Sequence, residues 1–331
     1  MEYRKLGQSD LESSVISMGC WGIAGGQMWG KQDEKDAIKA IRTAHDLGIN
    51  LFDTAEAYGD GYSEKVLGEA LADRRNEVLI ASKVKDSNLD HDSLKDACEG
   101  SLKRLDTDYI DLYYIHWPNH DIPIQETARA LEELKKEGKI RHYATSNFGV
   151  RDLDEILEHT NIDVNQLPYS LLWRSIEFGI QSSCIENDVS MACYSPLVHG
   201  LLTGKFENPE DVPDGRARTR HFSSERPHTR HGEEGVEEKT FRTIDAINDI
   251  CREAGIKMVH ASIAWVLSRK GVGTVITGAR NPNQVKSNVR AAEIDISEEV
   301  LNELTDVTED LKSQLGDNPD MWEGSGDSRY R

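Results

Sequence analysis

NLFDT (residues 50–54), VLIASK (78–83) and IDLYYIH (110–116) are short apolar runs of the kind that form buried β-strands. They start 28 and 32 residues apart, which leaves room for a helix and two loops after each strand. This stretch therefore predicts consecutive strand–helix units with parallel strands.

The same alternation continues on both sides of the stretch. Eight strands are expected in all, at residues 15–20, 50–54, 78–83, 110–116, 140–146, 163–167, 191–195 and 274–278. Helix-period segments are expected at 36–47, 93–105, 126–137, 152–159, 182–187, 236–254, 257–268 and 282–292. Eight such units predict an α/β fold, the (β/α)8 TIM barrel. The alternative is an open doubly wound sheet, but such sheets carry a G-x-G-x-x-G turn after the first strand, and none occurs.

One connection is much longer than the others. Residues 198–270, between the seventh and eighth expected strands, hold a polar loop followed by two helices. The loop has five arginines between residues 216 and 230, and a second loop-like segment, 313–331, forms the tail. We expect one barrel domain over 1–331, with extra helices in the long connection and at the C-terminus, and with the long connection overhanging the end of the barrel that carries the site.

Charge and composition exclude several functions. The 331 residues include 39 Lys and Arg against 59 Asp and Glu, a net charge of −20, which argues against nucleic acid or an anionic membrane as a partner. No apolar run reaches the about 18 residues of a membrane span, and the opening residues do not look like a signal peptide, so a cytoplasmic protein is expected. Five cysteines without a CxxC pair predict neither a disulfide framework nor a metal site.

Four side chains with complementary chemistry fall near the ends of neighbouring strands. Asp53, Lys83 and His116 come from the second, third and fourth expected strands, and Tyr58 follows Asp53 in a loop. A barrel gathers these ends on one rim. An ammonium beside a phenol lowers the pKa of the phenol, a carboxylate holds the ammonium, and an imidazole orients a carbonyl. The set predicts proton transfer to a carbonyl oxygen, with a nicotinamide cofactor as the implied hydride source.

Motifs along the whole chain resemble those of one family. They are FDTAEAYG (52–59), SK (82–83), IHWP (115–118), ATSNF (144–148), NQ (165–166), YSPL (194–197) and TGARNPNQVKSN (277–288). In this order they resemble the aldo-keto reductase superfamily of NAD(P)H-dependent carbonyl reductases, which have (β/α)8 barrels. The resemblance further implies that about residues 1–14 form a β-hairpin that plugs the bottom of the barrel.

The resemblance also implies a role for each site residue. Tyr58 is the expected general acid, Asp53 and Lys83 tune it, and His116 orients the substrate carbonyl. The residues expected at the cofactor are Ser146, Asn147, Gln166, Tyr194, Ser195, Leu197, Gly200, Leu202, Lys205, Gly278, Arg280, Gln284 and Asn288. Among them Tyr194 is expected to stack on the nicotinamide, and Arg280 is the candidate contact for a 2′-phosphate. NADP(H) is therefore favoured over NAD(H).

The substrate side is expected to combine aromatic and basic residues. The expected contacts are Trp21, Trp29, Trp117, Arg218 and Arg220. The tail, with Arg329 and Arg331, is expected to fold over the same mouth. Because guanidinium groups match carboxylate and phosphate, a polar, sugar-like carbonyl compound is expected, including anionic ones.

Three kinds of function fit these residues. The first is reduction of small-molecule aldehydes or ketones with NADPH. The second is a cofactor-binding regulatory subunit similar to potassium-channel β subunits. The third is a barrel aldolase that uses Lys83 as a Schiff-base amine, which needs neither Tyr58 nor His116. The sequence leaves open whether the chain forms a homo-oligomer.

Overall fold

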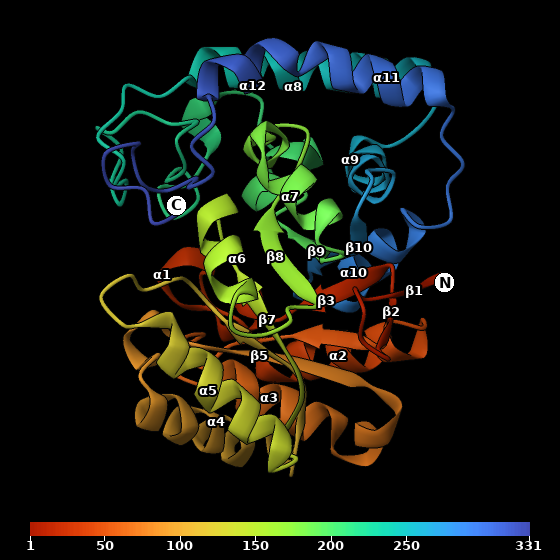
Figure 1. The fold of residues 1–331 in the computed structure, drawn as a ribbon. Coiled ribbons are helices and arrows are strands. Elements are labelled where there is room, and N and C mark those ends of the chain that lie inside the picture. The colour runs from red at the N-terminus through yellow and green to blue at the C-terminus, as the bar shows by residue number, and fades with distance from the viewer.

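The computed structural model describes residues 1–331, the side chain of Gln27 excepted. Eight parallel strands close into a barrel in the order β10-β3-β4-β5-β6-β7-β8-β9 (Figure 1). The strands are β3 (Ile16–Gly19), β4 (Leu51–Asp53), β5 (Leu79–Val84), β6 (Ile110–Ile115), β7 (Ile140–Ser146), β8 (Val164–Pro168), β9 (Ser190–Tyr194) and β10 (Val272–Gly278). The expected (β/α)8 barrel is confirmed, and each expected strand is present to within two residues at either end.

Helices surround the barrel. They are α2 (Glu34–Asp46), α3 (Tyr62–Leu71), α4 (His91–Leu105), α5 (Ile124–Lys136), α6 (Val150–Leu157), α7 (Ile180–Glu186), α9 (Met258–Leu267) and α10 (Pro282–Arg290). In α5, Ala130, Leu131 and Leu134 form one buried face, and Gly138 follows the helix at φ 75°. Helix α3 was not among the expected segments. It begins after Gly61, which is left-handed and supplies no side-chain cap, so the usual start signal is missing.

Shorter helical segments lie mostly in the loops. They are α1 (Gly26–Trp29) and the 3-10 helices η1 (Trp21–Ala24), η2 (Ala72–Glu77), η3 (Asp86–Asn88), η4 (Ser175–Phe178), η5 (Val198–Thr203) and η6 (Pro209–Asp211). Segments η1, α1 and η5 follow the carboxyl ends of β3 and β9, where they border the site described below.

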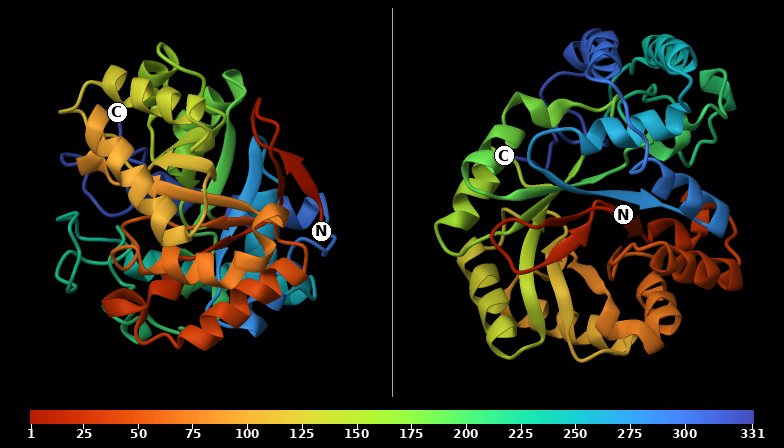
Figure 2. Two further views of the ribbon diagram at one scale, coloured as in Figure 1. Left: turned by 90° about the horizontal axis from the view of Figure 1, so that it is seen from below. Right: turned by 90° about the vertical axis from the view of Figure 1, so that its right-hand side faces the viewer.

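An antiparallel hairpin plugs the barrel, as expected. Its strands are β1 (Tyr3–Lys5) and β2 (Glu12–Ser14). Leu6 and Leu11 between them are fully buried and pack among the inward-facing side chains of the barrel. The Gly7 amide donates to Ser190 Oγ at the start of β9, so the hairpin covers the amino ends of the strands. The right-hand view of Figure 2 shows it crossing in front of the barrel.

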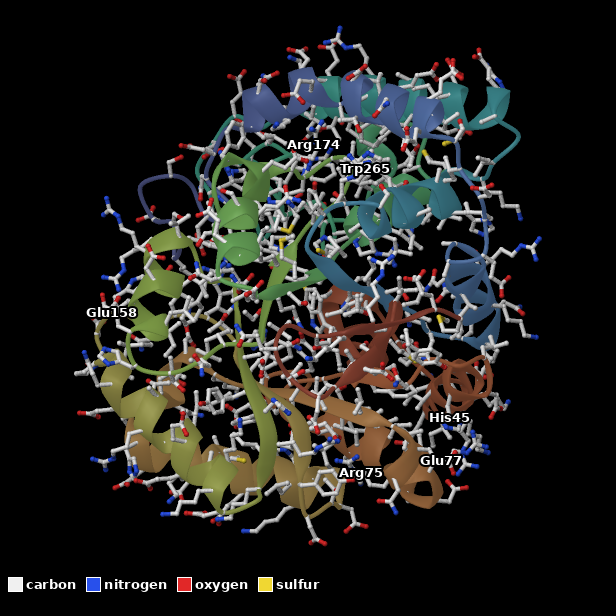
Figure 3. All side chains as sticks on the ribbon, turned by 45° about the vertical axis from the view of Figure 1, so that its right-hand side comes forward. His45, Arg75, Glu77, Glu158, Arg174 and Trp265 are labelled. Carbon is white, nitrogen blue, oxygen red and sulfur yellow. The ribbon has the colours of Figure 1, made fainter. Side chains whose placement is uncertain are left out.

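Three further helices form a layer on one side of the barrel. They are α8 (Glu237–Glu253), α11 (Glu298–Val307) and α12 (Glu309–Leu315), at the top of Figure 1. Arg174 Nη1 donates to the Thr305 main-chain oxygen at 2.8 Å, and Trp265 Nε1 donates to Thr305 Oγ1 at 2.9 Å. Figure 3 shows Arg174 and Trp265 below this layer, where they tie it to the barrel.

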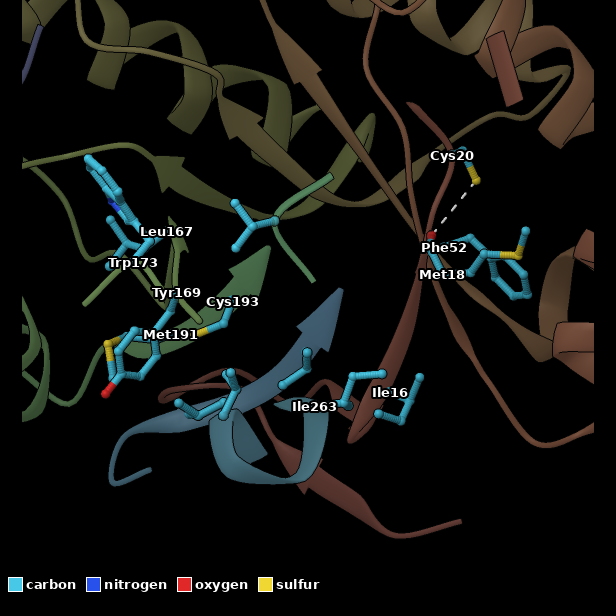
Figure 4. Close-up of a cluster of buried hydrophobic side chains, with 14 of the residues drawn as sticks. Ile16, Met18, Cys20, Phe52, Leu167, Tyr169, Trp173, Met191, Cys193 and Ile263 are labelled. Atoms are coloured by element: carbon cyan, nitrogen blue, oxygen red, sulfur yellow. Dashed lines mark hydrogen bonds between the residues drawn. The ribbon is translucent and has the colours of Figure 1, made fainter. Parts of the chain in front are cut away.

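The main apolar core lies between strands and helices. Met18 of β3, Met191 of β9 and Ile263 of α9 belong to it and are at most 1% exposed (Figure 4). All five cysteines are buried and unpaired. Within the described chain, no helix has both the length and the apolar character needed to cross a membrane.

Candidate active site

A cavity of about 740 Å³ opens at the carboxyl ends of the strands. Loops after β3, β4, β6, β7, β9 and β10 line it, together with Trp322 and Arg329 of the tail. Its volume lies within the about 300–1,000 Å³ typical of ligand pockets, and this end of a barrel is where barrel enzymes carry their sites. Among the described residues, no three His, Cys, Asp or Glu side chains are grouped so that they could hold a metal ion.

A buried lysine organises the centre of the cavity wall. Lys83 Nζ donates to Asp53 Oδ1 at 2.6 Å, to the Thr54 main-chain oxygen at 2.7 Å and to Tyr58 Oη at 3.3 Å. These bonds use all three protons of an ammonium group. Gln166 Nε2 donates to Asp53 Oδ2 at 2.7 Å, so both carboxylate oxygens are engaged. The adjacent strands β4 and β5 thus bring together the residues that the sequence placed on one rim.

His116 lies beside Tyr58 at the end of β6. The two ring centroids are 5.7 Å apart, the ring planes are 79° apart, and both residues line the cavity. Burial lowers the pKa of His116 well below its usual range, and the cations Lys83 and Arg329 lower it further. The imidazole is therefore neutral at pH 7, with one ring nitrogen that donates a hydrogen bond and one that accepts.

The phenol of Tyr58 has a shifted pKa. Burial raises the pKa of Tyr58 well above its usual value, and electrostatic interactions with Asp53 and Cys20 raise it further. Burial thus dominates the pKa of this phenol before a substrate binds, and the expected lowering of the pKa by Lys83 stays a prediction. Burial also lowers the pKa of Lys83, although Asp53 opposes that shift. Tyr58 is thus a neutral phenol that keeps its proton at pH 7.

The wall expected at the nicotinamide is held by a hydrogen-bond network. Asn147 Oδ1 accepts from the hydroxyls of Tyr194 and Tyr330, each at 2.8 Å, and Asn147 Nδ2 donates to Ser146 Oγ at 3.1 Å. The Tyr194 ring faces Trp322, with centroids 6.3 Å apart and planes 9° apart. The tail therefore meets the wall directly, through Tyr330 and Trp322.

The far part of the cavity is formed by the segment after β9 and the start of α10. The expected residues that line it are Ser195, Leu197, Gly200, Lys205, Gly278, Arg280, Gln284 and Asn288. Leu202 does not line it, and its expected cofactor contact is corrected, because its fully buried side chain packs into the core. Gly200 has φ 101°, a backbone conformation that residues with a side chain rarely adopt, so this position favours glycine.

Arg280 is engaged with the loop that precedes α2. Its guanidinium donates to the main-chain oxygens of Trp29 at 2.6 Å and Lys31 at 2.5 Å, and to Gln32 Oε1 at 2.6 Å. These contacts hold residues 29–32 against the edge of the cavity. The contact of Arg280 with a 2′-phosphate stays a prediction.

Comparison with known proteins decides the family. The family model for the "Aldo/keto reductase family" matches residues 15–309. The chain belongs to the aldo/keto reductase family. It is 35% identical over 302 residues to "Aldo-keto reductase YhdN" of Bacillus subtilis, covering 87% of both chains. It is 33% identical over 319 residues to the "NADH-specific methylglyoxal reductase" of Escherichia coli, covering 88% of this chain and 94% of that one.

A solved structure gives the same answer for the fold. An aldo-keto reductase from Klebsiella pneumoniae in complex with NADPH superposes with a TM-score of 0.74 at 28% identity, covering 93% of this chain and 96% of that one. The barrel of this aldo/keto reductase is therefore shared with a protein that binds a nicotinamide cofactor.

Aromatic residues cover the reacting end of this aldo/keto reductase. The expected Trp21, Trp29 and Trp117 all line the cavity. Trp21 lies roughly parallel to the Tyr58 ring, with centroids 6.0 Å apart, and Trp29 meets Trp21 edge to face at 5.3 Å. These contacts place the Trp21 ring next to the phenol.

The arginines of the loop at 216–230, called the arginine loop here, fall into two groups. Arg216, Arg218 and Arg230 line the cavity. Arg220 does not: its guanidinium donates to Glu233 and to the main-chain oxygens of Leu315 and Asn318. The expectation that Arg220 contacts substrate is therefore corrected, because it is buried and joins the loop to the tail.

The two arginines of the tail also differ. Arg329 lines the cavity, whereas Arg331 pairs with Asp152 and Glu155 of α6 and lies outside it. The expectation that Arg331 covers the mouth is corrected on this ground.

His199 and Trp322 are among the cavity residues that were not expected from the sequence. His199 meets Trp21 and Trp29 edge to face, and neither of its ring nitrogens forms a hydrogen bond of normal geometry with a described residue. Its position depends on consecutive left-handed residues, Val198 at φ 42° and His199 at φ 54°, which no local pattern signals. Trp322 did have a signal, since it is the one tryptophan in a tail that was expected to cover the mouth.

Proposed function

We propose that this chain reduces aldehydes or ketones to alcohols with NADPH as the hydride donor, with Tyr58 as the general acid. The observation that supports this most strongly is the bonded set of Asp53, Lys83 and Tyr58 beside His116 in one cavity. A neutral phenol that touches an ammonium can give up its proton when a negative charge develops on a nearby oxygen, because the phenolate that results is stabilised by the cation.

Each residue has one task in the proposed reaction. His116 donates a hydrogen bond to the substrate carbonyl and orients it. The cofactor, when bound, supplies a hydride to the carbonyl carbon. Tyr58 transfers its proton to the carbonyl oxygen, so that the C=O bond becomes an alcohol. Lys83 holds the phenolate, Asp53 holds Lys83, and the proton is restored from solvent.

The residues of the far cavity fit a phosphorylated cofactor. Lys205 and Arg216 face it, and no ion pair joins either of them to a carboxylate among the described residues. Burial, followed by the nearby Arg216, lowers the pKa of Lys205 to about 8. Partly buried cations without partners favour anions, and the phosphates of NADP(H) supply them. We keep Arg280 as the proposed contact to the 2′-phosphate, and NADPH as the preferred cofactor.

The proposal covers the chain as one barrel domain. The long connection at 198–270 and the tail at 313–331 form the mouth of the cavity, and a polar, sugar-like carbonyl is the proposed substrate. Unpaired cysteines agree with a reducing compartment such as the cytoplasm.

A panel of aldehydes and ketones, assayed with NADPH and NADH side by side, tests the proposal. We expect carbonyl-dependent oxidation of NADPH, with a higher kcat/KM than with NADH. Tight cofactor binding without turnover of any carbonyl would instead favour the regulatory-subunit function. Covalent trapping of a substrate on Lys83 by borohydride, without any need for cofactor, would favour the aldolase.

A further inference from the structure

Hydrogen-bond donors without partners gather at the mouth of the cavity. Trp322 Nε1 and Arg218 Nε are buried and have no partner among the described residues. Trp322 is 9% exposed, so water does not readily replace a missing partner there. Arg329 uses Nε and Nη2 for Asp320, at 2.7 and 2.9 Å, and its Nη1 has no partner among the described residues. A buried donor without a partner costs free energy, so Trp322 Nε1 and Arg218 Nε indicate a ligand that accepts hydrogen bonds. The Arg329 side chain is 27% exposed and offers that ligand a further donor.

Two of these donors lie close to the reacting groups. The Arg329 guanidinium lies 3.3 Å from the ring centroid of Trp117, which directly follows His116. Trp322 meets the same Trp117 ring edge to face, with centroids 6.0 Å apart. Arg329 also contributes to the lowered pKa of His116. A substrate whose carbonyl reaches His116 therefore passes within reach of these tail residues.

Arg218 lines the same cavity from the long connection. The positive charge of Arg218 contributes to the lowered pKa of His199. The positive charge of Arg230 in turn contributes to the lowered pKa of Arg218. His199 packs against Trp21, which in turn lies next to Tyr58. The loop at 216–230 and the tail thus meet at the entrance of the cavity, where Arg230 pairs with Glu323 of the tail.

The charge at this entrance is not balanced by the protein. Arg329 pairs with Asp320, and Arg230 pairs with Glu323 at 3.0 Å. Arg218 has no such partner among the described residues, and burial together with Arg230 lowers its pKa to about 10. The one carboxylate that lines the cavity, Asp53, is fully engaged by Lys83 and Gln166. An ionised guanidinium that is partly buried without a partner is unfavourable, and an anionic ligand removes that cost.

We propose that the substrate is an anionic carbonyl compound, with an aldehyde or ketone at one end and a carboxylate or phosphate that binds Arg218 at the other. Trp322 Nε1 and Arg329 Nη1 donate to its remaining oxygens. This inference rests on the proposed reductase function and adds the chemical class of the substrate. The competing assignment for Arg218 is a phosphate of the cofactor, which the experiment separates.

Two aldehydes that differ by one charge and one methyl group test the proposal. We would measure kcat/KM for 4-carboxybenzaldehyde and for its uncharged methyl ester, methyl 4-formylbenzoate, with NADPH at low salt. The carboxylate should be favoured by at least about tenfold, the scale of one charge-assisted hydrogen bond. In Arg218→Gln this preference should fall close to one, with the Kd of NADPH unchanged. Arg226→Gln is the matched control, because Arg226 pairs with Glu237 and does not line the cavity, and it should keep the preference.

The possible outcomes distinguish a failure of the anionic-substrate inference from a failure of the reductase function. Equal kcat/KM for both aldehydes in the unmodified protein would overturn the anionic substrate and leave the reductase intact. A weaker Kd for NADPH in Arg218→Gln, with the preference kept, would assign Arg218 to the cofactor and also overturn it. If neither aldehyde oxidises bound NADPH, the reductase function fails and this inference falls with it. If Arg218→Gln does not fold, the preference of the unmodified protein for the carboxylate is measured at increasing KCl concentration. The preference must shrink as the salt screens the contact, and a preference that does not change with salt would overturn the proposal.

Discussion

Tyr58 meets three requirements of a proton donor to a carbonyl. It lines the cavity, it has an imidazole beside it, and its oxygen touches an ammonium that is fully buried. The raised pKa of Tyr58 and the lowered pKa of His116 keep both groups neutral at pH 7. Beside them, Lys83 and Asp53 form a buried ion pair, so each of these two charges has a partner before the substrate binds.

Replacing Tyr58 by phenylalanine removes the proton and keeps the ring. We expect kcat for carbonyl reduction by Tyr58→Phe to fall by at least about 10²-fold, the low end for general acid catalysis. The Kd of NADPH, measured by fluorescence titration, should change little. Turnover at the rate of the unmodified protein would remove Tyr58 from the mechanism.

The two shifted pKa values predict a flat pH profile. His116 gains a proton only below its lowered pKa, and Tyr58 loses one only above its raised pKa. Neither group therefore changes its charge between about pH 6 and 8, where an ordinary histidine titrates. Plotted against pH, kcat/KM for a neutral aldehyde should be constant over this range. An inflection near pH 6.5 that disappears in His116→Gln would show that the histidine titrates normally.

The loops and the tail, rather than the strands, shape the cavity. Segment 29–32 is held by Arg280, and the long connection is joined to the tail by Arg220. Both arginines bind main-chain oxygens of segments far away in the chain. Each therefore fixes the position of a whole segment.

Arg280→Ala should weaken cofactor binding by releasing segment 29–32. We expect the Kd of NADPH to rise by at least about tenfold, which corresponds to about 1.4 kcal/mol, because the three bonds of the guanidinium are lost. A smaller loss for NADH would assign part of the effect to the 2′-phosphate. Arg290→Ala is the control, since Arg290 lies on the exposed side of α10 and pairs with Glu293. Equal Kd values in Arg280→Ala and the unmodified protein would contradict the proposed role.

Arg220→Met should act on stability instead of substrate binding. Its loss leaves Glu233 and the oxygens of Leu315 and Asn318 without their donor, in a place where the arginine is 5% exposed. Breaking a buried pair on one side costs about 3–5 kcal/mol, so the free energy of unfolding, measured in urea, should fall by that order. An unchanged unfolding midpoint together with a raised KM would return Arg220 to the substrate side.

Arg220 and Arg280 show which features could not be predicted from the sequence. The strands could be predicted because each is a local apolar run, and the spacing of about 30 residues is set by the barrel itself. Asp53, Lys83 and His116 follow from the strands, since strand ends are fixed in space once the barrel closes. The partners of Arg220 lie 95 and 98 residues further along the chain, and no local pattern encodes such a pairing. His199 shows the same limit, because its place depends on left-handed backbone that side chains rarely adopt.

The molecule as a whole is acidic, whereas its cavity is basic. The net charge is −20, yet six cationic residues line the cavity against one carboxylate: Lys205, Arg216, Arg218, Arg230, Arg280 and Arg329 against Asp53. A cleft lined by one sign of charge concentrates ligands of the opposite sign, even when the rest of the surface repels them. This contrast fits the proposed cofactor and the proposed substrate, which are both anions.

Hydride transfer itself can be followed with deuterium. NADPH carrying deuterium on one or the other face of C4 would be incubated with the protein and a good aldehyde substrate, and the alcohol analysed by mass spectrometry. We predict that one of the two labelled cofactors delivers one deuterium to the carbinol carbon and that the other delivers none, because the cavity holds the ring in one orientation against Tyr58 and His116. Alcohol without deuterium from either cofactor, or no alcohol at all while NADPH is bound, would contradict the assignment of this chain as a carbonyl reductase.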